Sequence, residues 1–231
     1  MNPDRIAENL ANVRGRIADA AKRSGRKASD IKLVAVTKRN AAESIRELVR
    51  LGQLDLGENY PQELWEKAEE LADLPIRWHL IGHLQGNKTK KTVPMVRMIH
   101  GVDSLKLLQS LDQMAGAMAD PPIVCLQVNV SGETSKHGWS PEALIEDAGA
   151  ISHCTRIPIV GLMTIAGYGT SNEEARPAFA RLRELRDRFR LATDFPLPEL
   201  SMGMSGDYEA AIEEGATLVR IGSALFEGAL E

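Results

Sequence analysis

The stretch IKLVAVTKRNAAESIRELVRLG, residues 31–52, contains one strand followed by one helix. Residues 31–37 form a short apolar run rich in Val, Ile and Leu, which is typical of a strand that is covered on both faces in a parallel sheet. Apolar side chains then recur at three-to-four spacing at Ile45, Leu48 and Val49, which predicts an amphipathic helix. A buried strand that leads into an amphipathic helix is the repeating unit of α/β folds.

The same unit recurs along the rest of the chain. Seven further apolar runs predict strands at residues 54–59, 77–82, 98–102, 122–130, 158–165, 199–204 and 217–226. Eight strand–helix units of about 25 residues each favour a closed (β/α)8 barrel of the TIM type. An open doubly wound sheet is the alternative, and it is less favoured because no glycine-rich dinucleotide fingerprint follows the first strand. No linker divides the chain, so we expect one barrel domain over residues 1–231.

The composition excludes several classes of protein. Of the 231 residues, 43% are hydrophobic and 26% are charged, as in an ordinary soluble domain with a full core. The formal net charge of −4 gives no general affinity for nucleic acid. No apolar run approaches the roughly 20 residues that a membrane-spanning helix needs. We therefore expect neither a nucleic-acid partner nor a membrane partner.

The segment MNPDRIAENLANVRGRIADAAKRSG, residues 1–25, precedes the first predicted strand. Its charged and apolar residues follow helical spacing, which predicts an extra N-terminal helix that covers the bottom of the barrel. It lacks the apolar stretch that follows the basic start of a signal peptide. The two cysteines, Cys125 and Cys154, form no CxxC pair and are expected to stay reduced in a cytoplasmic protein.

Lys38 stands directly after the first predicted strand. Active sites of (β/α)8 barrels lie at the carboxyl ends of the strands, which is where this lysine falls. Ring closure makes the last strand the neighbour of the first, so Lys38 is expected beside residues 217–226. The alternative is an ordinary lysine at a strand end that reaches solvent and binds nothing.

Two polar segments after the last two strands suit a phosphate group. Ser205-Gly206-Asp207 offers a hydroxyl, a flexible glycine and the free N–H groups of a helix start, and Gly222-Ser223 offers a second hydroxyl with close backbone approach. The loops after strands seven and eight are the common phosphate site of this fold. The alternative is that Ser205 and Asp207 only cap a helix.

Arg220 lies within an otherwise apolar strand. Strand alternation places it on the same side as Leu218 and Gly222, so its guanidinium needs a partner, because an unpaired buried charge costs several kcal/mol. An internal salt bridge with a carboxylate such as Glu58 is one interpretation, and a ligand-facing donor is the other.

The phosphate site gives Lys38 a possible chemical role. A lysine amine that faces a phosphate-bearing aldehyde can form a Schiff base, and pyridoxal 5′-phosphate (PLP) carries both groups.

Seven motifs together carry a resemblance to a known family. They are LVAVTK (33–38), GENYPQE (57–63), WHLIGHLQGNK (78–88), HGVDS (100–104), QVNVSGETSKHG (127–138), GLMTIAGY (161–168) and SMGMSGDYEAAIEEGATLVRIGSALF (201–226). On these motifs the chain resembles, over nearly its full length, the pyridoxal phosphate homeostasis protein family. The barrel of that family is similar to the N-terminal domain of alanine racemase. The set of motifs is specific, whereas no single one would be.

The resemblance implies a PLP site at the top of the barrel. It implies that Lys38 holds the cofactor as an internal aldimine and that Arg220 meets the pyridine nitrogen. The residues that it implies for the phosphate group are Ser205, Gly222 and Ser223. It also implies that Asn59 lies near the aldimine side of the ring and that His79 lies on the barrel floor close to the cofactor.

An arginine at the pyridine nitrogen would limit the chemistry of the cofactor. Because a guanidinium stays protonated, it disfavours a proton on that nitrogen, and the ring then withdraws electrons poorly. Racemisation remains open in principle but needs a second acid–base group on the opposite face of the substrate. Alanine racemase takes this group, a tyrosine, from a second domain of a partner subunit. Here Tyr60 and Tyr168 fall on predicted top loops, and neither is a well-supported partner base.

The resemblance therefore implies a non-catalytic carrier that stores and buffers PLP and delivers it to PLP-dependent apo-enzymes by transient contact. The alternative is a PLP-dependent amino-acid racemase of the alanine racemase type. From the residues alone, a third interpretation is a barrel aldolase whose lysine attacks a sugar-phosphate carbonyl. A compact barrel without an apolar exposed stripe is expected to be a monomer.

The remaining polar residues carry weaker signals. Lys88, Lys90 and Lys91 form a basic cluster that suits a phosphate or an acidic protein surface, or merely a solvated helix face. The five histidines fall at positions 79, 83, 100, 137 and 153, and no metal site is expected from them. Residues 131–139 are expected to form a polar loop at the top of the barrel.

Overall fold

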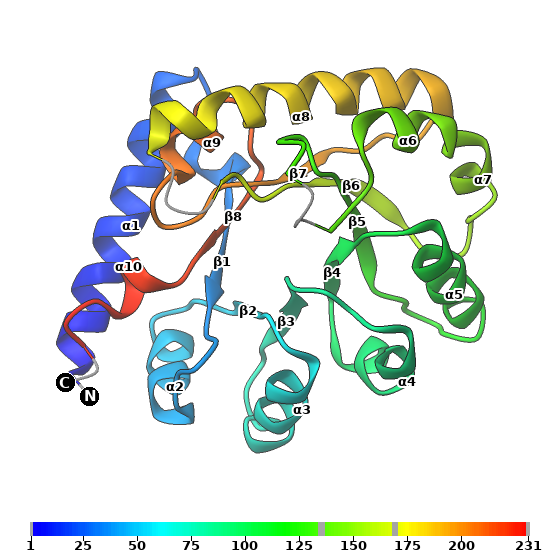
Figure 1. Ribbon diagram of the computed structural model, residues 1–231. Helices are drawn as coiled ribbons and strands as arrows, with labels where there is room; N and C mark the ends of the chain where they lie inside the picture. Colours follow the sequence, from blue (N-terminus) through cyan, green and yellow to red (C-terminus); the bar gives the residue numbers. More distant parts are fainter. Residues whose placement is uncertain (1, 134–136, 168–170, 230–231) are drawn as a thin grey trace.

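Eight parallel strands close into a barrel in the computed structural model, which describes residues 2–133, 137–167 and 171–229 (Figure 1). In chain order the strands are β1 (Lys32–Val36), β2 (Asp55–Glu58), β3 (Arg77–Leu80), β4 (Met98–Val102), β5 (Ile123–Gln127), β6 (Ile159–Met163), β7 (Glu199–Ser201) and β8 (Leu218–Ile221). Each strand pairs with the next, and β8 pairs in parallel with β1. The predicted (β/α)8 barrel is therefore confirmed, and the open sheet is excluded.

Helices surround the barrel on its outer side (Figure 1). The α-helices of the described residues are α1 (Pro3–Arg23), α2 (Ala42–Arg50), α3 (Pro61–Glu70), α4 (Thr89–Thr92), α5 (Leu105–Ala115), α6 (Pro141–Glu146), α7 (Ala148–Ser152), α8 (Asn172–Thr193), α9 (Tyr208–Glu213) and α10 (Ser223–Phe226). Short 3-10 turns complete the connections at η1 (Ala28–Asp30), η2 (Gly86–Lys88) and η3 (Val93–Met95). The alternation of strand and helix is the one that the apolar periodicity predicted.

The last strand is shorter than its apolar run. The sequence predicted a strand over residues 217–226, whereas β8 ends at Ile221 and Ser223 begins α10. Gly222 lies between them with φ −121° and ψ −76°, outside both the helical and the extended regions. Ala224 and Leu225 continue the apolar run, and both residue types favour a helix. The sequence therefore shows no change of pattern where the strand ends and the helix begins.

The predicted N-terminal helix, α1, lies along the side of the barrel. Its buried stripe includes Ile6, Leu10 and Val13 and packs against α2, α9 and α10. Its position differs from the predicted one across the bottom, because this stripe finds its apolar partners on the neighbouring helices. Near its middle, Arg14 and Ile17 reach the wall of a pocket at the start of β1.

Two separate clusters of buried residues fill the molecule. The larger cluster lies between the strands and the helices and is apolar. The smaller cluster lies inside the barrel, and its members are Val34, Val36, Ile81, Met98, Cys125, Met163 and Leu218. Because side chains alternate along a strand, His79 and Arg220 face the same interior, each two residues from a member of the smaller cluster. The barrel interior therefore mixes apolar and polar groups.

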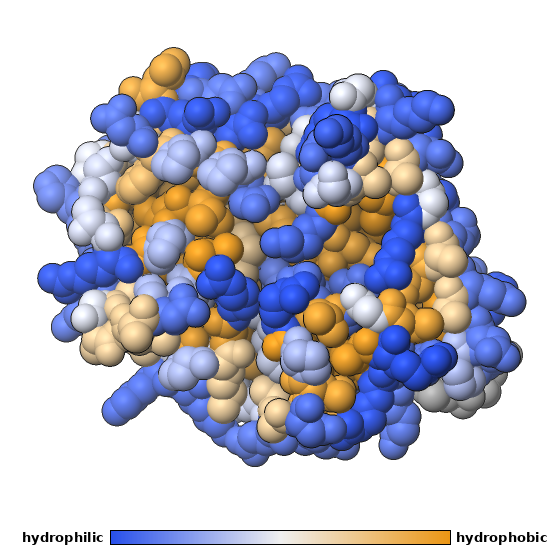
Figure 2. All heavy atoms as spheres, turned by 180° about the vertical axis from the view of Figure 1, so that it is seen from behind, coloured by the Kyte–Doolittle hydropathy of each residue, from blue (hydrophilic) through white to orange (hydrophobic). Residues whose placement is uncertain are grey.

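The surface is mostly hydrophilic. Figure 2 shows the face turned away from the reader in Figure 1, where hydrophilic side chains cover the rim and apolar atoms show between them. The large hydrophobic side chains that stay exposed among the described residues are Tyr60, Ile165 and Leu191. Within the same part of the chain, no helix is both long and apolar enough to cross a lipid bilayer.

Candidate functional site

Lys38 lies at the carboxyl end of β1 and is exposed. The strand register pairs Val36 with Gly57 of β2, so its continuation by two residues places Lys38 level with Asn59. On the other side of β1, a Cβ added to Gly222 would lie 3.2 Å from the Cβ of Val36. Barrel closure therefore gathers Lys38, Asn59 and Gly222 at one end of the barrel, as the sequence predicted.

The buried carboxylate of Glu58 supports the end of β1. Its Oε1 accepts hydrogen bonds from Oγ1 of Thr37 (2.6 Å) and from Nζ of Lys67 in α3 (2.7 Å). The same Nζ donates to the backbone oxygen of Thr37 (2.8 Å). Burial raises the pKa of Glu58, although the Lys67 ammonium opposes this shift. Glu58 is thus paired with Lys67, and the salt bridge considered between Glu58 and Arg220 is not formed.

Ser205 lies where the loops after β7 and β8 meet. Its Oγ accepts hydrogen bonds from the backbone N–H groups of Gly222 (3.3 Å) and Ala224 (3.4 Å). Asp207 stands at the N-cap of α9, but its carboxylate accepts from the N–H of Met204 (2.6 Å) and makes no capping bond. The capping alternative is therefore not supported for Asp207, and Ser205 joins the two loops into one polar corner, which we call the β7–β8 corner.

Arg220 is 4% exposed and extends into the barrel. Its Nη1 donates to Oγ of Ser201 in β7 (2.6 Å), and its Nη2 donates to the backbone oxygen of Thr164 (3.0 Å). Burial lowers the pKa of Arg220 to about 10, and the nearby Asp207 carboxylate opposes this shift. The guanidinium therefore stays charged at neutral pH and is fixed by two other segments of the barrel.

His79 is buried in the barrel interior. Its Nε2 lies 3.0 Å from Oδ1 of Asp55, and its Nδ1 lies 2.8 Å from Nε2 of His100. The other nitrogen of His100, Nδ1, lies 2.6 Å from Oγ of Ser201, the hydroxyl that accepts from Arg220. The structure thus places His79 inside the barrel, as expected, and joins it to Arg220 through His100 and Ser201.

The sequence analysis missed Asp55, His100 and Ser201. Each lies in a short strand that the sequence identifies mainly by its apolar residues, so the polar residues within it were not considered. Strand alternation with interior residues such as Gly57 was the available signal for Asp55. Alternation could not show which polar residues meet, because β4 and β7, which carry His100 and Ser201, are not neighbours in the barrel.

The two described tyrosines, Tyr60 and Tyr208, lie in different surroundings. Tyr60 follows β2 and is 52% exposed. Tyr208 is buried in α9, the guanidinium of Arg16 lies 5.4 Å from its ring centroid, and its hydroxyl has no partner among the described residues. Tyr168 lies outside the described residues. Of the two described tyrosines, Tyr60 alone combines exposure with a position at the carboxyl ends of the strands.

The basic cluster includes a lysine that is engaged at the surface. Nζ of Lys91 lies 3.7 Å from Oε1 of Glu69 and 4.6 Å from the centroid of the Trp65 ring. Lys90 is exposed. These contacts favour the interpretation of this segment as a solvated helix face.

Three side chains that could hold a metal ion meet at the top rim, although the sequence predicted no metal site. One ligand atom each from His83, Asp103 and His137 lies within 4.8 Å of the others. The Asp103 carboxylate is already paired, since its Oδ2 lies 2.6 Å from Nδ1 of His83, and the two histidine rings stack with centroids 4.7 Å apart. The three residues come from different loops, so their spacing in the chain could not reveal the cluster. Residues 134–136 of the predicted loop lie outside the described residues.

The closed barrel identifies the fold class of the chain. The family model described as alanine racemase, N-terminal domain, matches residues 2–229. The solved structure of alanine racemase from Clostridium difficile superposes with a TM-score of 0.76 at 16% identity and covers 98% of this chain and 57% of that one. At this identity the likeness shows the fold alone.

Closer relatives define the family. The pyridoxal phosphate homeostasis protein of Pseudomonas aeruginosa is 48% identical over 221 residues, which are 96% of this chain and 94% of that protein. The structure of PipY from Synechococcus elongatus, solved with PLP bound, superposes with a TM-score of 0.85 at 39% identity and covers 96% of this chain and 99% of that one. The chain belongs to the family of pyridoxal phosphate homeostasis proteins.

Proposed function

We propose that this protein binds PLP covalently through Lys38 and acts in intracellular PLP homeostasis, by storing and buffering the cofactor and delivering it to apo-enzymes. The observation that carries this proposal is barrel closure, which sets the end of β1 with Lys38 beside Arg220 and the β7–β8 corner. The name of the P. aeruginosa relative and the PLP bound to PipY support it.

The residues at this end of the barrel fit the cofactor chemically. The cations of Lys38 and Arg220 suit an anionic ligand, and hydrogen bonds from charged donors to such a ligand are strong. The hydroxyls of Ser205 and Ser223 suit a phosphate group, which would take over the N–H of Gly222 from Oγ of Ser205. A Cβ on Gly222 would lie 3.2 Å from the Cβ of Val36, so glycine lets the two strand ends approach without a shift of β1.

Two further residues belong to the proposed binding set. Asn59, at the end of β2, lies level with Lys38 on the side away from β8. His79 acts from the barrel interior, through His100 and Ser201, on the side chain of Arg220. We therefore place Asn59 beside the ring and His79 behind Arg220.

The proposed role is non-catalytic. PLP supplies a reactive aldehyde and an electron-withdrawing ring when it is bound. Arg220 keeps its proton at neutral pH, because its pKa of about 10 is still well above 7. A guanidinium at the pyridine nitrogen disfavours a proton there, so the ring withdraws fewer electrons than it would beside a carboxylate. Arg220 thus suits retention of the cofactor better than its use in catalysis.

Borohydride reduction followed by peptide mass mapping tests the attachment. The purified protein is incubated with PLP, reduced and digested, and we expect a pyridoxyl adduct on the peptide that contains Lys38. Lys38→Ala should lose the adduct and the visible absorption band, whereas Lys32→Ala removes the lysine at the other end of the same strand and should keep both. An adduct on another lysine, or none at all, would refute the proposed site.

An amino-acid racemase is the second candidate, and the exposed Tyr60 beside Asn59 is the observation that favours it. The assay incubates the PLP-loaded protein with L-alanine or L-serine and measures the D-isomer by chiral chromatography. We expect no interconversion. Interconversion by the parent protein that is lost in Tyr60→Phe would refute the carrier role and identify the protein as a racemase.

Delivery to apo-enzymes has its own test. The PLP-loaded protein is mixed with a PLP-dependent apo-enzyme in the presence of an aldehyde trap that captures free PLP. Activation despite the trap is expected for transfer by transient contact, and its loss would show release into solution instead.

We also propose that the protein is a cytoplasmic monomer, so light scattering should give a mass near 25.3 kDa.

A further inference from the structure

A continuous line of hydrogen bonds crosses the barrel interior from Arg220 to Asp55. Nη1 of Arg220 lies 2.6 Å from Oγ of Ser201, which lies 2.6 Å from Nδ1 of His100. Nε2 of His100 lies 2.8 Å from Nδ1 of His79, whose Nε2 lies 3.0 Å from Oδ1 of Asp55. All five side chains are buried. The line joins β8, β7, β4, β3 and β2, and we call it the interior relay.

The two ends of the interior relay fix its direction. A guanidinium can only donate, so Ser201 accepts from Arg220 and its own proton is free to point to His100. At the other end, Arg77 donates to both oxygens of Asp55 (2.9 and 2.5 Å), and the pKa of this carboxyl lies far below its usual value, so Asp55 can only accept. Every donor in the line therefore points from Arg220 towards Asp55.

This direction determines which nitrogens carry protons. Because Asp55 accepts, Nε2 of His79 carries a proton, and its Nδ1 accepts from Nε2–H of His100. Nδ1 of His100 then accepts from the hydroxyl of Ser201. With both imidazoles neutral, each of the four links has one donor and one acceptor, and every polar atom of the line is satisfied.

The surroundings favour the neutral imidazoles. Burial lowers the pKa of His79 and lowers that of His100 further. The positive charge of Lys32 on β1 acts in the same direction on both rings, and Arg220 on β8 does so on His100. The Asp55 carboxylate favours a charge on His79 but does not outweigh its burial.

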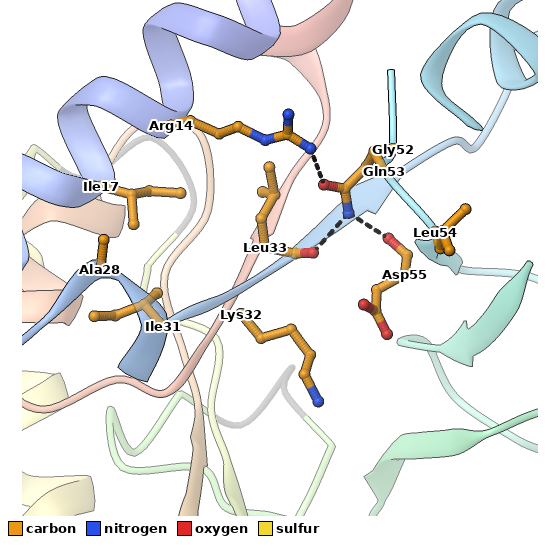
Figure 3. A pocket seen from close by; sticks show the side chains of 10 residues that line it. All are labelled: Arg14, Ile17, Ala28, Ile31, Lys32, Leu33, Gly52, Gln53, Leu54 and Asp55. Carbon is orange, nitrogen blue, oxygen red and sulfur yellow. Dashed lines mark hydrogen bonds between the residues drawn. The ribbon is translucent and has the colours of Figure 1, made fainter. Parts of the chain in front are cut away.

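The far end of the interior relay reaches a pocket of about 340 Å³ at the amino-terminal end of the barrel. Figure 3 shows that the side chains of Lys32 and Asp55 extend into the same space. The amide of Gln53 bonds the backbone oxygens of Leu33 (2.8 Å) and Asp55 (2.9 Å), and Arg14 of α1 donates to Gln53 (3.4 Å). Gln53 thus fixes the backbone of Asp55 at the mouth opposite to Lys38, while Arg77 and His79 hold its carboxylate.

We propose that Asp55, His79, His100 and Ser201 are positioning residues that hold Arg220 in one orientation through this one-directional line of hydrogen bonds. The pocket at the amino-terminal end of the barrel is thereby coupled to the cofactor site at the other end. The role of Arg220 towards PLP rests on the proposed function, whereas the direction of the interior relay is a property of the chain without PLP.

Loss of the Asp55 charge would remove what fixes this direction. His79 could then carry its proton on Nδ1 and donate to His100, whose own proton would move to Nδ1 and point at Ser201. The Ser201 oxygen would face two donors, and its hydroxyl proton would lose the acceptor that it has in His100. Arg220 would then be held less firmly, although Asp55 lies four links away.

Nuclear magnetic resonance of the 15N-labelled protein without PLP tests the direction. Long-range proton–nitrogen correlation spectra show which imidazole nitrogen carries the proton, and His79→Gln and His100→Gln assign the two signals. We expect both rings to be neutral and protonated at Nε2 at pH 7.5. A proton on Nδ1 of either ring would overturn the interior relay, whether or not the protein binds PLP.

Asp55→Asn tests the coupling, and Asp73→Asn is its control, because Asp73 also accepts two hydrogen bonds from one arginine, Arg46, but at the surface. In Asp55→Asn we expect altered imidazole signals and PLP affinity about fivefold weaker, the effect of one lost hydrogen-bond partner. In Asp73→Asn both should match the parent. Parental imidazole signals or parental PLP affinity in Asp55→Asn would refute the coupling.

Ser201→Ala provides an independent measurement if Asp55→Asn does not fold. It removes the link beside Arg220, so the His100 Nδ1 signal should change and PLP affinity should fall, while the His79 Nε2 proton should stay on its nitrogen. An unchanged His100 signal would overturn the interior relay. Failure of the parent protein to bind PLP at Lys38 would instead refute the proposed function and leave the spectra to decide the relay.

Discussion

The layer between strands and helices and the interior of the barrel are both buried, yet they are built from different residues. The outer layer packs large apolar side chains that are fully buried, such as Leu48, Leu80 and Phe179. The interior places histidines and an arginine beside a few apolar residues, whereas branched apolar residues dominate most barrels of this type. The comparison indicates that the outer layer stabilises the fold and that the interior serves the site.

The two regions should also respond differently to substitution. An apolar layer loses stability in proportion to the volume removed, because a cavity remains. A hydrogen-bonded interior loses most when one partner is removed and the other stays buried without it. Replacing both partners of a buried ion pair by apolar residues of similar size is often neutral for stability, whereas removing one partner is costly.

The largest change in stability is expected in the outer layer. Leu80→Ala should lower the free energy of unfolding by about 3 kcal/mol, because it leaves a cavity between β3 and the helices. Urea unfolding measures this, and Leu191→Ala, at a position that is 88% exposed, is the control that should stay within about 0.5 kcal/mol of the parent. An equal loss in both variants would contradict the role assigned to the outer layer.

Arg220→Leu should distinguish most clearly between the two roles, stability in the outer layer and PLP binding in the interior. We expect the free energy of unfolding to fall by about 1–2 kcal/mol, less than in Leu80→Ala, because Ser201 and the backbone oxygen of Thr164 lose their donor. PLP affinity should nevertheless fall about 100-fold, as when one partner of a buried charged contact is lost. Calorimetric titration measures the affinity.

The control for this variant is Arg26→Leu. Arg26 also donates to backbone oxygens, those of Ile212 and Ala216, but it lies near the end of α1. Its PLP affinity should equal that of the parent. A collapse of stability in Arg220→Leu with PLP affinity intact would reverse the roles that we assign to the two regions.

The pH dependence of stability should arise partly from the interior. The folded-state pKa values of His79 and His100 lie below those of the unfolded chain, so the unfolded state binds more protons as the pH falls below about 6.5. Stability from the two neutral rings is thus complete above pH 6.5 and decreases below it, with a slope of at most about 1.4 kcal/mol per pH unit for each ring. Urea unfolding between pH 5 and 8 measures this slope.

His100→Gln should make this slope smaller, because one buried imidazole is removed. His153→Gln removes an exposed imidazole and should leave the slope unchanged. Equal slopes in the parent and in His100→Gln would show that the interior histidines are not neutral in the folded protein.

The smallest effect is expected at the surface, outside both regions. Replacement of Lys88, Lys90 and Lys91 together by alanine should leave PLP affinity within about twofold of the parent, because exposed charges are screened by salt. Calorimetric titration at low and at physiological ionic strength measures this. A loss of affinity that appears at low salt would show that the cluster attracts the phosphate group.

The outer layer explains why so much of the fold could be predicted from the sequence. Helices that pack on a barrel show their buried face as three-to-four spacing, as at Ile45 and Leu48, and buried strands show as short apolar runs. Ring closure then followed from the number of strands, and it correctly brought Ser205 to Gly222. The sequence could not show that residues 223–226 form a helix, since strand and helix are both apolar there.

The interior could be predicted only in part. Alternation placed Arg220 inside, but both faces of these strands are buried, so a polar residue such as His100 shows no pattern of its own. Its partners depend on the register of strands that are distant in the sequence. The partner of Glu58 could not be predicted either, because Lys67 reaches it from a helix and not from a neighbouring strand.

The pairing of β1 with β8 has a consequence for synthesis on the ribosome. Lys38 emerges early, whereas Arg220 and Ser223 of the neighbouring last strand and its loop are made long after it. A nascent or truncated chain that stops before residue 218 contains the lysine but neither the arginine nor the second serine. The characteristic colour of the bound vitamin would therefore mark only chains that have been translated beyond β8 and folded.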